Sequence, residues 1–195
     1  MEKVIRLLKI SEVNESILED LAKNLNLKFM EFNISIDPLI KEINLDKSFY
    51  DKLRQQYDAS KILNEITSVS RREQVFRTLG IIDQDIYVED LNFVFGLARS
   101  PKSNIPWQPI GALISILRLR ETFYRRSQNE IIFQERILKE AIHELGHTFG
   151  LSHCNKICIM RFSNTLADTD NKPPSFCNSC LKDLKEFFEK LDDSF

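Results

Sequence analysis

The chain has 195 residues and a mass of 22.9 kDa, which suits one well-buried domain over residues 1–195 and is short for two. It carries 27 Lys and Arg against 29 Asp and Glu, and this near balance excludes a general attraction to nucleic acid or to an anionic membrane surface. No apolar run approaches the roughly 18 residues of a membrane span, and the charged N-terminal stretch does not resemble a signal peptide. We therefore expect a cytoplasmic protein.

The chain begins with a strand–helix–strand pattern and continues with further strands before its last helices. Apolar spacing and an Asn14 cap predict a strand over residues 4–10 and a helix that ends near Asn26. Next we expect a strand over 27–35, an irregular segment over 35–57, a helix over 60–75, and strands over 77–82, 91–98 and 111–119. This order is typical of an α/β (α+β) fold.

Three segments of the second half have the clearest patterns. Residues 111–119 are almost continuously apolar, which predicts a central strand covered on both faces, whereas residues 91–98 suit an edge strand. Apolar residues recur at helical spacing over residues 129–149, which predicts a long helix that faces a core. A final amphipathic helix is expected to begin near Cys177.

All three histidines of the chain fall in one short stretch. His143 and His147 are four residues apart, so on a helix their rings project from one face and can reach one Zn²⁺ at about 2.0–2.1 Å. Gly150 can adopt a left-handed conformation that ends the helix and turns the chain back, and His153 then supplies a third nitrogen. The pattern His-Glu-x-x-His-x-x-Gly-x-x-His therefore predicts a zinc site with three neutral ligands.

Three protein ligands leave the fourth position of zinc to water, as in catalytic sites. The metal lowers the pKa of that water to about 7, and Glu144 is placed to take its proton as a general base. We expect a zinc metallopeptidase that hydrolyses peptide bonds in a peptide or protein substrate and acts as a monomer. Two alternatives stay open: a non-catalytic peptide-binding or protein-binding module that keeps zinc for its architecture, and hydrolysis of a non-peptide amide.

The four cysteines form two short-spaced pairs, Cys154-x-x-x-Cys158 and Cys177-x-x-Cys180. Such pairs are typical of a tetrahedral Cys₄ zinc site, and four thiolates leave no position for substrate. We therefore expect two zinc ions per chain, one catalytic and one structural. In a reducing compartment such as the cytoplasm, clustered cysteines also favour a metal site over disulfides.

The combined motif over residues 143–180, including Met160, resembles the archaemetzincin family of metzincin zinc peptidases. This resemblance implies a compact metzincin-like domain with a twisted mixed β-sheet, an antiparallel edge strand and an active-site helix. It also implies a zinc-stapled C-terminal segment that ends in a helix. His143, His147 and His153 then correspond to the ligands of the catalytic zinc, and the four cysteines match the second zinc site of the family.

The resemblance also implies roles outside the ligand sets. Met160 matches the methionine that forms a hydrophobic base beneath the zinc site, and residues 91–98 match the edge strand that binds extended substrate through main-chain hydrogen bonds. Phe162 stands where some metzincins carry a tyrosine. Oxyanion stabilisation is therefore expected to come mainly from zinc, unless Tyr87 or Tyr124 approaches the site.

Two clusters of charge carry weaker signals. Arg118 and Arg120 belong to a basic stretch that suits an acidic substrate, although a solvated loop explains it more simply. Asp83 and Asp85 follow a predicted strand, and a turn accounts for both.

Overall fold

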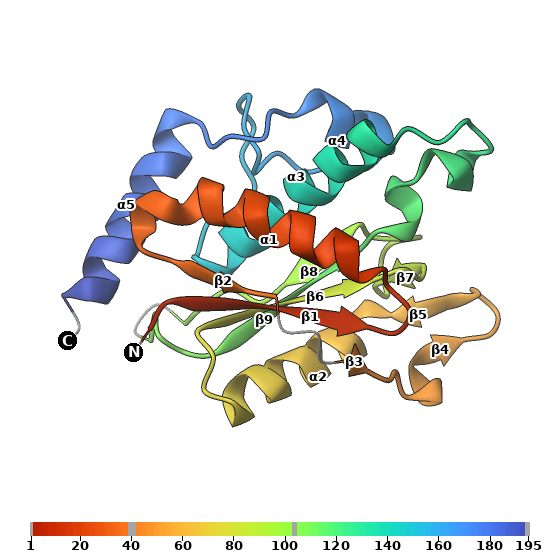
Figure 1. Ribbon diagram of the computed structural model, residues 1–195, viewed down its shortest axis with the longest axis horizontal. Coiled ribbons are helices and arrows are strands. Elements are labelled where there is room, and N and C mark those ends of the chain that lie inside the picture. Colours follow the sequence, from red (N-terminus) through yellow and green to blue (C-terminus); the bar gives the residue numbers. More distant parts are fainter. Residues whose placement is uncertain (1, 39–41, 103–104, 194–195) are drawn as a thin grey trace.

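A computed structural model describes residues 2–38, 42–102 and 105–193 of the chain (Figure 1). Its main sheet has the strand order β2 (Ser35–Asp37), β1 (Val4–Ile10), β6 (Arg77–Ile82), β9 (Ile110–Ser115) and β8 (Gly96–Ala98), and β3 (Glu42–Ile43) also pairs with β1. The pairs of β1 with β2, β3 and β6 and of β6 with β9 are parallel, whereas β8 runs antiparallel to β9 at the edge. The expected mixed sheet with an antiparallel edge strand is confirmed.

Helices cover both faces of this sheet, as Figure 1 shows. The helices α1 (Glu15–Phe29), α3 (Glu130–Thr148) and α5 (Asn178–Asp192) lie on one face, and α2 (Ala59–Arg72) lies on the other. The strands supply both cores by alternation: Leu79 and Ile81 belong to the core under α1 and α3, whereas Ile82 belongs to the core under α2. Because helices cover both faces, every residue of β6 and β9 is buried, and most of these residues are apolar.

Smaller elements complete the fold. A second sheet consists of β4 (Tyr50–Asp51), β5 (Gln56–Asp58) and β7 (Ile86–Tyr87), and the short helix α4 (Leu166–Asn171) precedes α5. Short 3₁₀ helices span Met30–Phe32, Lys47–Phe49, Leu117–Leu119 and Glu121–Tyr124. Within the described ranges, no helix is both long enough and apolar enough to cross a membrane.

The predicted starts of α1 and α3 agree with the structure, and each has a local side-chain cap. The Asn14 side chain accepts a hydrogen bond from the Ser16 amide, and Asn129 accepts one from the Ile132 amide at the start of α3. Such caps satisfy amide groups that have no partner within the helix.

The strand predicted over residues 27–35 is wrong. The helix α1 continues to Phe29 and is followed by a 3₁₀ helix, so the strand β2 begins only at Ser35. The apolar stripe of α1 extends through Leu25 to Phe29, four residues further, and both side chains are fully buried. The chain turns at Asn33, which adopts a left-handed conformation with φ of 53°.

Two other predicted strands are shorter in the structure. Only Gly96–Ala98 of residues 91–98 pair as a strand, and β9 ends at Ser115 instead of extending to 119. The chain beyond β9 leaves the sheet, and there two ion pairs hold it: Arg118 Nε to Asp85 Oδ1 at 2.6 Å and Arg120 Nη2 to Asp83 Oδ2 at 2.7 Å. The interpretation of these charges as a solvated loop and a simple turn therefore missed their mutual pairing.

Candidate metal centres

The helix α3 brings the first two histidines together. The Nε2 atoms of His143 and His147 are 3.1 Å apart, as the four-residue spacing on one helix face predicts. His143 is buried, whereas the ring of His147 is half-buried at the floor of a cleft. Since α3 packs on β8 and β9, the same packing that builds the core orients both rings.

A glycine turn brings in the third histidine. Gly150 has φ of +87°, a conformation that favours glycine, and its amide donates to the His147 carbonyl as α3 ends. The chain then returns so that His153 Nε2 lies 3.2 Å from His147 Nε2. The left-handed conformation predicted for Gly150 and the grouping of the three rings are both observed.

Main-chain carbonyls orient two of the rings. His143 Nδ1 lies 2.9 Å from the Ile159 carbonyl oxygen, and His147 Nδ1 lies 2.8 Å from that of Leu151. Each Nδ1–H can donate a hydrogen bond to its carbonyl, which leaves the lone pair of Nε2 free to bind a metal. Tetrahedral zinc with bonds of 2.0–2.1 Å would space two nitrogens by about 3.3 Å. The observed spacings of 3.1 and 3.2 Å fit a zinc ion held by the three Nε2 atoms.

Burial also favours the neutral form of the three histidines. It lowers the pKa of His143 to about 2, with a further contribution from the positive charge of Lys172. Burial likewise lowers the pKa of His147 and His153. Because a metal binds the unprotonated imidazole, these surroundings favour the form of the side chain that acts as a ligand.

Glu144 lies with the three histidines in a cleft of about 470 Å³. Its side chain is 5% exposed, and burial together with the nearby charge of Glu140 raises its pKa well above the usual range. The other wall of the cleft is largely apolar and comes from Val88, Leu91, Phe93, Phe95, Leu97 and Phe162. The cleft therefore combines three histidines that could hold a metal ion, a buried carboxylate and room for a chain with apolar side chains.

A buried ion pair behind the cleft was missed by the sequence analysis. Lys172 Nζ lies 2.9 Å from Glu140 Oε1, both side chains are almost fully buried, and the Thr169 hydroxyl donates a hydrogen bond to the same oxygen. Glu140 precedes Glu144 by one helical turn, which was the only local signal. Nothing in the sequence places Lys172 opposite it, because α4 and α3 meet only in the tertiary structure.

The residues expected to surround the zinc site have distinct positions. The Met160 sulfur packs against Gly146, which lies on α3 between the first two histidines, and the Phe162 ring centroid lies 4.9 Å from that of His153. Neither Tyr87 nor Tyr124 is among the described residues that line the cleft. The structure therefore provides no tyrosine hydroxyl in the cleft as a second oxyanion donor.

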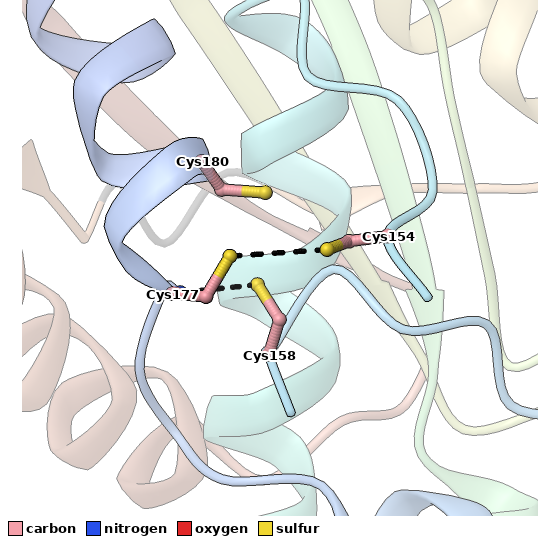
Figure 2. Close-up of side chains that lie close together, drawn as sticks. All are labelled: Cys154, Cys158, Cys177 and Cys180. Carbon is pink, nitrogen blue, oxygen red and sulfur yellow. Dashed lines mark hydrogen bonds between the residues drawn. The ribbon is translucent and has the colours of Figure 1, made fainter. Parts of the chain in front are cut away.

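The four cysteines meet beside the start of α5 (Figure 2). Cys177 caps this helix and Cys180 lies in its first turn, while Cys154 and Cys158 come from the loop after His153. All four thiols are free, and their sulfur atoms lie within 4.8 Å of one another. The Cys154 and Cys177 sulfurs are 3.8 Å apart, about the spacing required by tetrahedral zinc with bonds near 2.3 Å.

Hydrogen bonds to sulfur help this group to ionise. The amide of Cys177 donates to Cys158 Sγ at 3.2 Å, and that of Lys156 donates to Cys154 Sγ at 3.5 Å. The Ser179 hydroxyl contributes most to lowering the pKa of Cys177 to about 6, whereas burial raises the pKa of Cys158 and Cys180. A divalent cation would complete the ionisation, so the group fits a closed zinc site.

Comparisons with known proteins agree with this geometry. Residues 8–186 match the profile of Peptidase family M54. An archaemetzincin of Pyrococcus furiosus is 37% identical, covering 95% of this chain and 94% of its own length. Among solved structures, an archaemetzincin of Methanopyrus kandleri is 30% identical with a TM-score of 0.79, covering 96% of this chain and 97% of that one.

A second similar solved structure is that of a protein described as zinc-dependent. It is a zinc-dependent peptidase of Methanocorpusculum labreanum, 28% identical with a TM-score of 0.78, and the alignment covers 92% of this chain and 99% of that one. Because the family profile spans most of the chain and the relatives match over nearly their full length, this chain belongs to Peptidase family M54, the archaemetzincins, and is a zinc metallopeptidase.

Proposed function

We propose that this chain hydrolyses peptide bonds at a zinc ion held by His143, His147 and His153, with Glu144 as the general base. A second zinc ion, held by the four cysteines, is structural. The substrate is a segment of a peptide or protein that enters the cleft beside β8. The observation that carries the proposal is the convergence of three Nε2 atoms beside a buried carboxylate in one cleft.

Zinc, when bound, polarises a carbonyl group and lowers the pKa of water, which is the chemistry that amide hydrolysis requires. Glu144 accepts the proton of the attacking water on a carboxylate oxygen and then donates it to the leaving amine. The apolar wall of the cleft reduces access of bulk water to the scissile bond.

The Glu144→Gln variant tests the general base. It keeps the size of the side chain but removes its basicity, so kcat/KM is expected to fall by about 10²- to 10⁴-fold. Cleavage of a peptide library measures activity, and elemental analysis is expected to give an unchanged zinc content. The exposed Glu135 on the same helix provides the control: Glu135→Gln should keep full activity. Hydrolysis retained in Glu144→Gln would contradict the assignment.

Metal content tests the two ligand sets separately. The wild-type chain is expected to hold two zinc ions and the His153→Ala variant about one, because the cysteine group does not depend on the His153 side chain. If the wild-type chain and the His153→Ala variant both hold one zinc even after zinc is added, the three-histidine site is not a zinc site. The alternative of a non-catalytic peptide-binding module would then replace the proposal.

We further propose that residues 1–195 form one domain that acts as a monomer in the cytoplasm. The two ends of the chain support the first point, because the Phe188 ring stacks on Phe32 at 4.7 Å and Lys3 pairs with Asp192. The four free thiols suit a reducing compartment. Light scattering should give the mass of one chain, 22.9 kDa, and denaturant unfolding should proceed in a single transition.

A further inference from the structure

The edge strand and the proposed general base are in direct contact at a single glycine. Gly96 opens β8 and pairs with Ile114 of the neighbouring strand β9. A Cβ atom at this position would lie 2.6 Å from Cγ and from Oε1 of Glu144 and 2.7 Å from its Cδ. The three atoms nearest to such a Cβ all belong to this one side chain, so the Glu144 carboxylate occupies the space that any other residue at position 96 would fill.

Backbone conformation does not explain this glycine. Of the five glycines, all within the described ranges, Gly150 is the one with a positive φ, so an alanine could adopt the backbone of Gly96 without strain. Tight packing in general does not explain it either. A Cβ at Gly80 would also be too close to its neighbours, at 2.5 Å from Ile66 Cδ1 and 2.7 Å from Ile10 Cδ1, but these are apolar core atoms on the α2 side of the sheet.

The space open to the Glu144 side chain lies on the side of the cleft that it lines. Glu144 is 5% exposed, and its own helix α3 packs against both β8 and β9. One turn earlier on the same face of α3 lies Glu140, which forms an ion pair with Lys172 and accepts a hydrogen bond from Thr169. A side chain at position 96 would therefore change the direction of the Glu144 carboxylate, while His143, His147 and His153 would keep their positions on α3 and in the turn after it.

We propose that Gly96 is a positioning residue: its lack of a side chain determines where the Glu144 carboxylate lies in the cleft. The inference rests on the proposed function for its effect on catalysis, but the steric relation itself can be measured without activity. It also gives the edge strand a role separate from any contact with substrate, because the strand forms the surface against which the carboxylate rests.

The test is a double-mutant cycle in which Gly96→Ala is introduced into the wild-type chain and into the Glu144→Ala variant. In the wild-type background, Gly96→Ala is expected to lower Tm by about 3 °C or more, because the new methyl group competes with Glu144 for space. In the Glu144→Ala background, most of this loss should disappear, because the competing atoms are gone. Gly80→Ala is the matched control, and its effect on Tm should be the same in both backgrounds.

Activity and metal content complete the test. Gly96→Ala is expected to lower kcat by about 10- to 100-fold with little change in KM, because the carboxylate is misplaced while the cleft stays open. Its zinc content should equal that of the wild-type chain, and Gly80→Ala should keep the wild-type kcat. If Gly96→Ala alone does not fold but the double variant does, the steric relation is supported.

Equal losses of Tm in the two backgrounds would overturn the proposal, as would an unfolded double variant or a wild-type kcat in Gly96→Ala. If the wild-type chain cleaves no peptide at all, the proposed function fails, and the Tm cycle alone then decides whether Gly96 positions Glu144.

Discussion

The histidines of this protein are prepared for metal by their hydrogen bonds and their burial. His143 and His147 each direct Nδ1 at a main-chain oxygen, which leaves Nε2 to face the other ligands. Burial lowers the pKa of all three histidines from the value near 6.5 of a free imidazole, most of all for His143, whose pKa falls to about 2. Fewer protons therefore have to leave these rings when a metal binds than would leave three ordinary histidines.

This property can be measured as proton release at pH 5.5. Three ordinary histidines would each be about 90% protonated and would release nearly three protons per zinc ion. With their pKa lowered, the three histidines are expected to release fewer than three protons in total, and almost none from His143, whose pKa is about 2, in calorimetric titrations with buffers of different ionisation enthalpy. The Glu144→Gln variant with its cysteine site loaded is the protein to use, because Glu144 has a raised pKa and would add its own proton. Release of nearly three protons would contradict the lowered pKa values.

At the scale of elements, a buried arginine at the first position of β6 joins this strand to the end of α3. Arg77 is fully buried and donates to the carbonyl oxygens of Thr148, Phe76, Gln108 and Pro106, at distances of 2.7 to 3.1 Å. Burial lowers its pKa to about 9. Its charge also lies at the C-terminal end of α3, where the helix dipole favours a cation. The turn that carries His153 begins at this point, so the Arg77 hydrogen bond to Thr148 holds the end of the helix from which this turn starts.

Replacement of Arg77 by Met should therefore destabilise the fold strongly. The change leaves two buried and two partly buried carbonyl oxygens without this donor, and each buried oxygen left unpaired costs about 1–3 kcal/mol, so the free energy of unfolding is expected to fall by about 3 kcal/mol or more. Urea titration measures the change. Arg72→Met on the exposed end of α2 is the control and should stay within about 0.5 kcal/mol of the wild-type chain. A similar small effect for Arg77→Met would show that water replaces the guanidinium.

At the scale of the whole molecule, the cysteine group ties the C-terminal helix to the loop that presents His153. Cys154 directly follows His153, whereas Cys177 and Cys180 start α5. This helix in turn places Phe188 against Phe149 at the end of α3, with ring centroids 5.0 Å apart. One zinc ion in this position would fix both the loop and the helix.

The Cys177→Ser variant should lose this zinc ion and much of its stability. Structural zinc contributes about 10 kcal/mol or more in small zinc domains, and here a hydrophobic core remains, so we expect a fall in Tm on the order of 10 °C. Thermal unfolding and zinc analysis on the same sample are the measurements. Asn155→Ser changes an exposed residue of the same loop and should leave both values unchanged. An unaltered Tm in Cys177→Ser would argue against a structural role for the cysteines.

The sequence was most informative where structure depends on neighbours along the chain. The grouping of His143, His147 and His153 follows from helix periodicity and one glycine turn, and that of the cysteines follows from two short loops. The end of α1 was misjudged because residues 27–35 are apolar enough for either a helix or a strand, and their packing against the core decides between the two.

By itself, then, the sequence determined the grouping of the three histidines, the grouping of the four cysteines and the family of the chain, because these depend on residue type and local geometry. The tertiary structure alone decided which distant groups meet: Lys172 with Glu140, Arg118 with Asp85, and Gly96 with Glu144. Each of these contacts joins two elements that are brought together by burial of a shared core. The hydrophobic effect that drives this burial is non-directional, so the spacing of residues along the chain does not encode which distant groups meet.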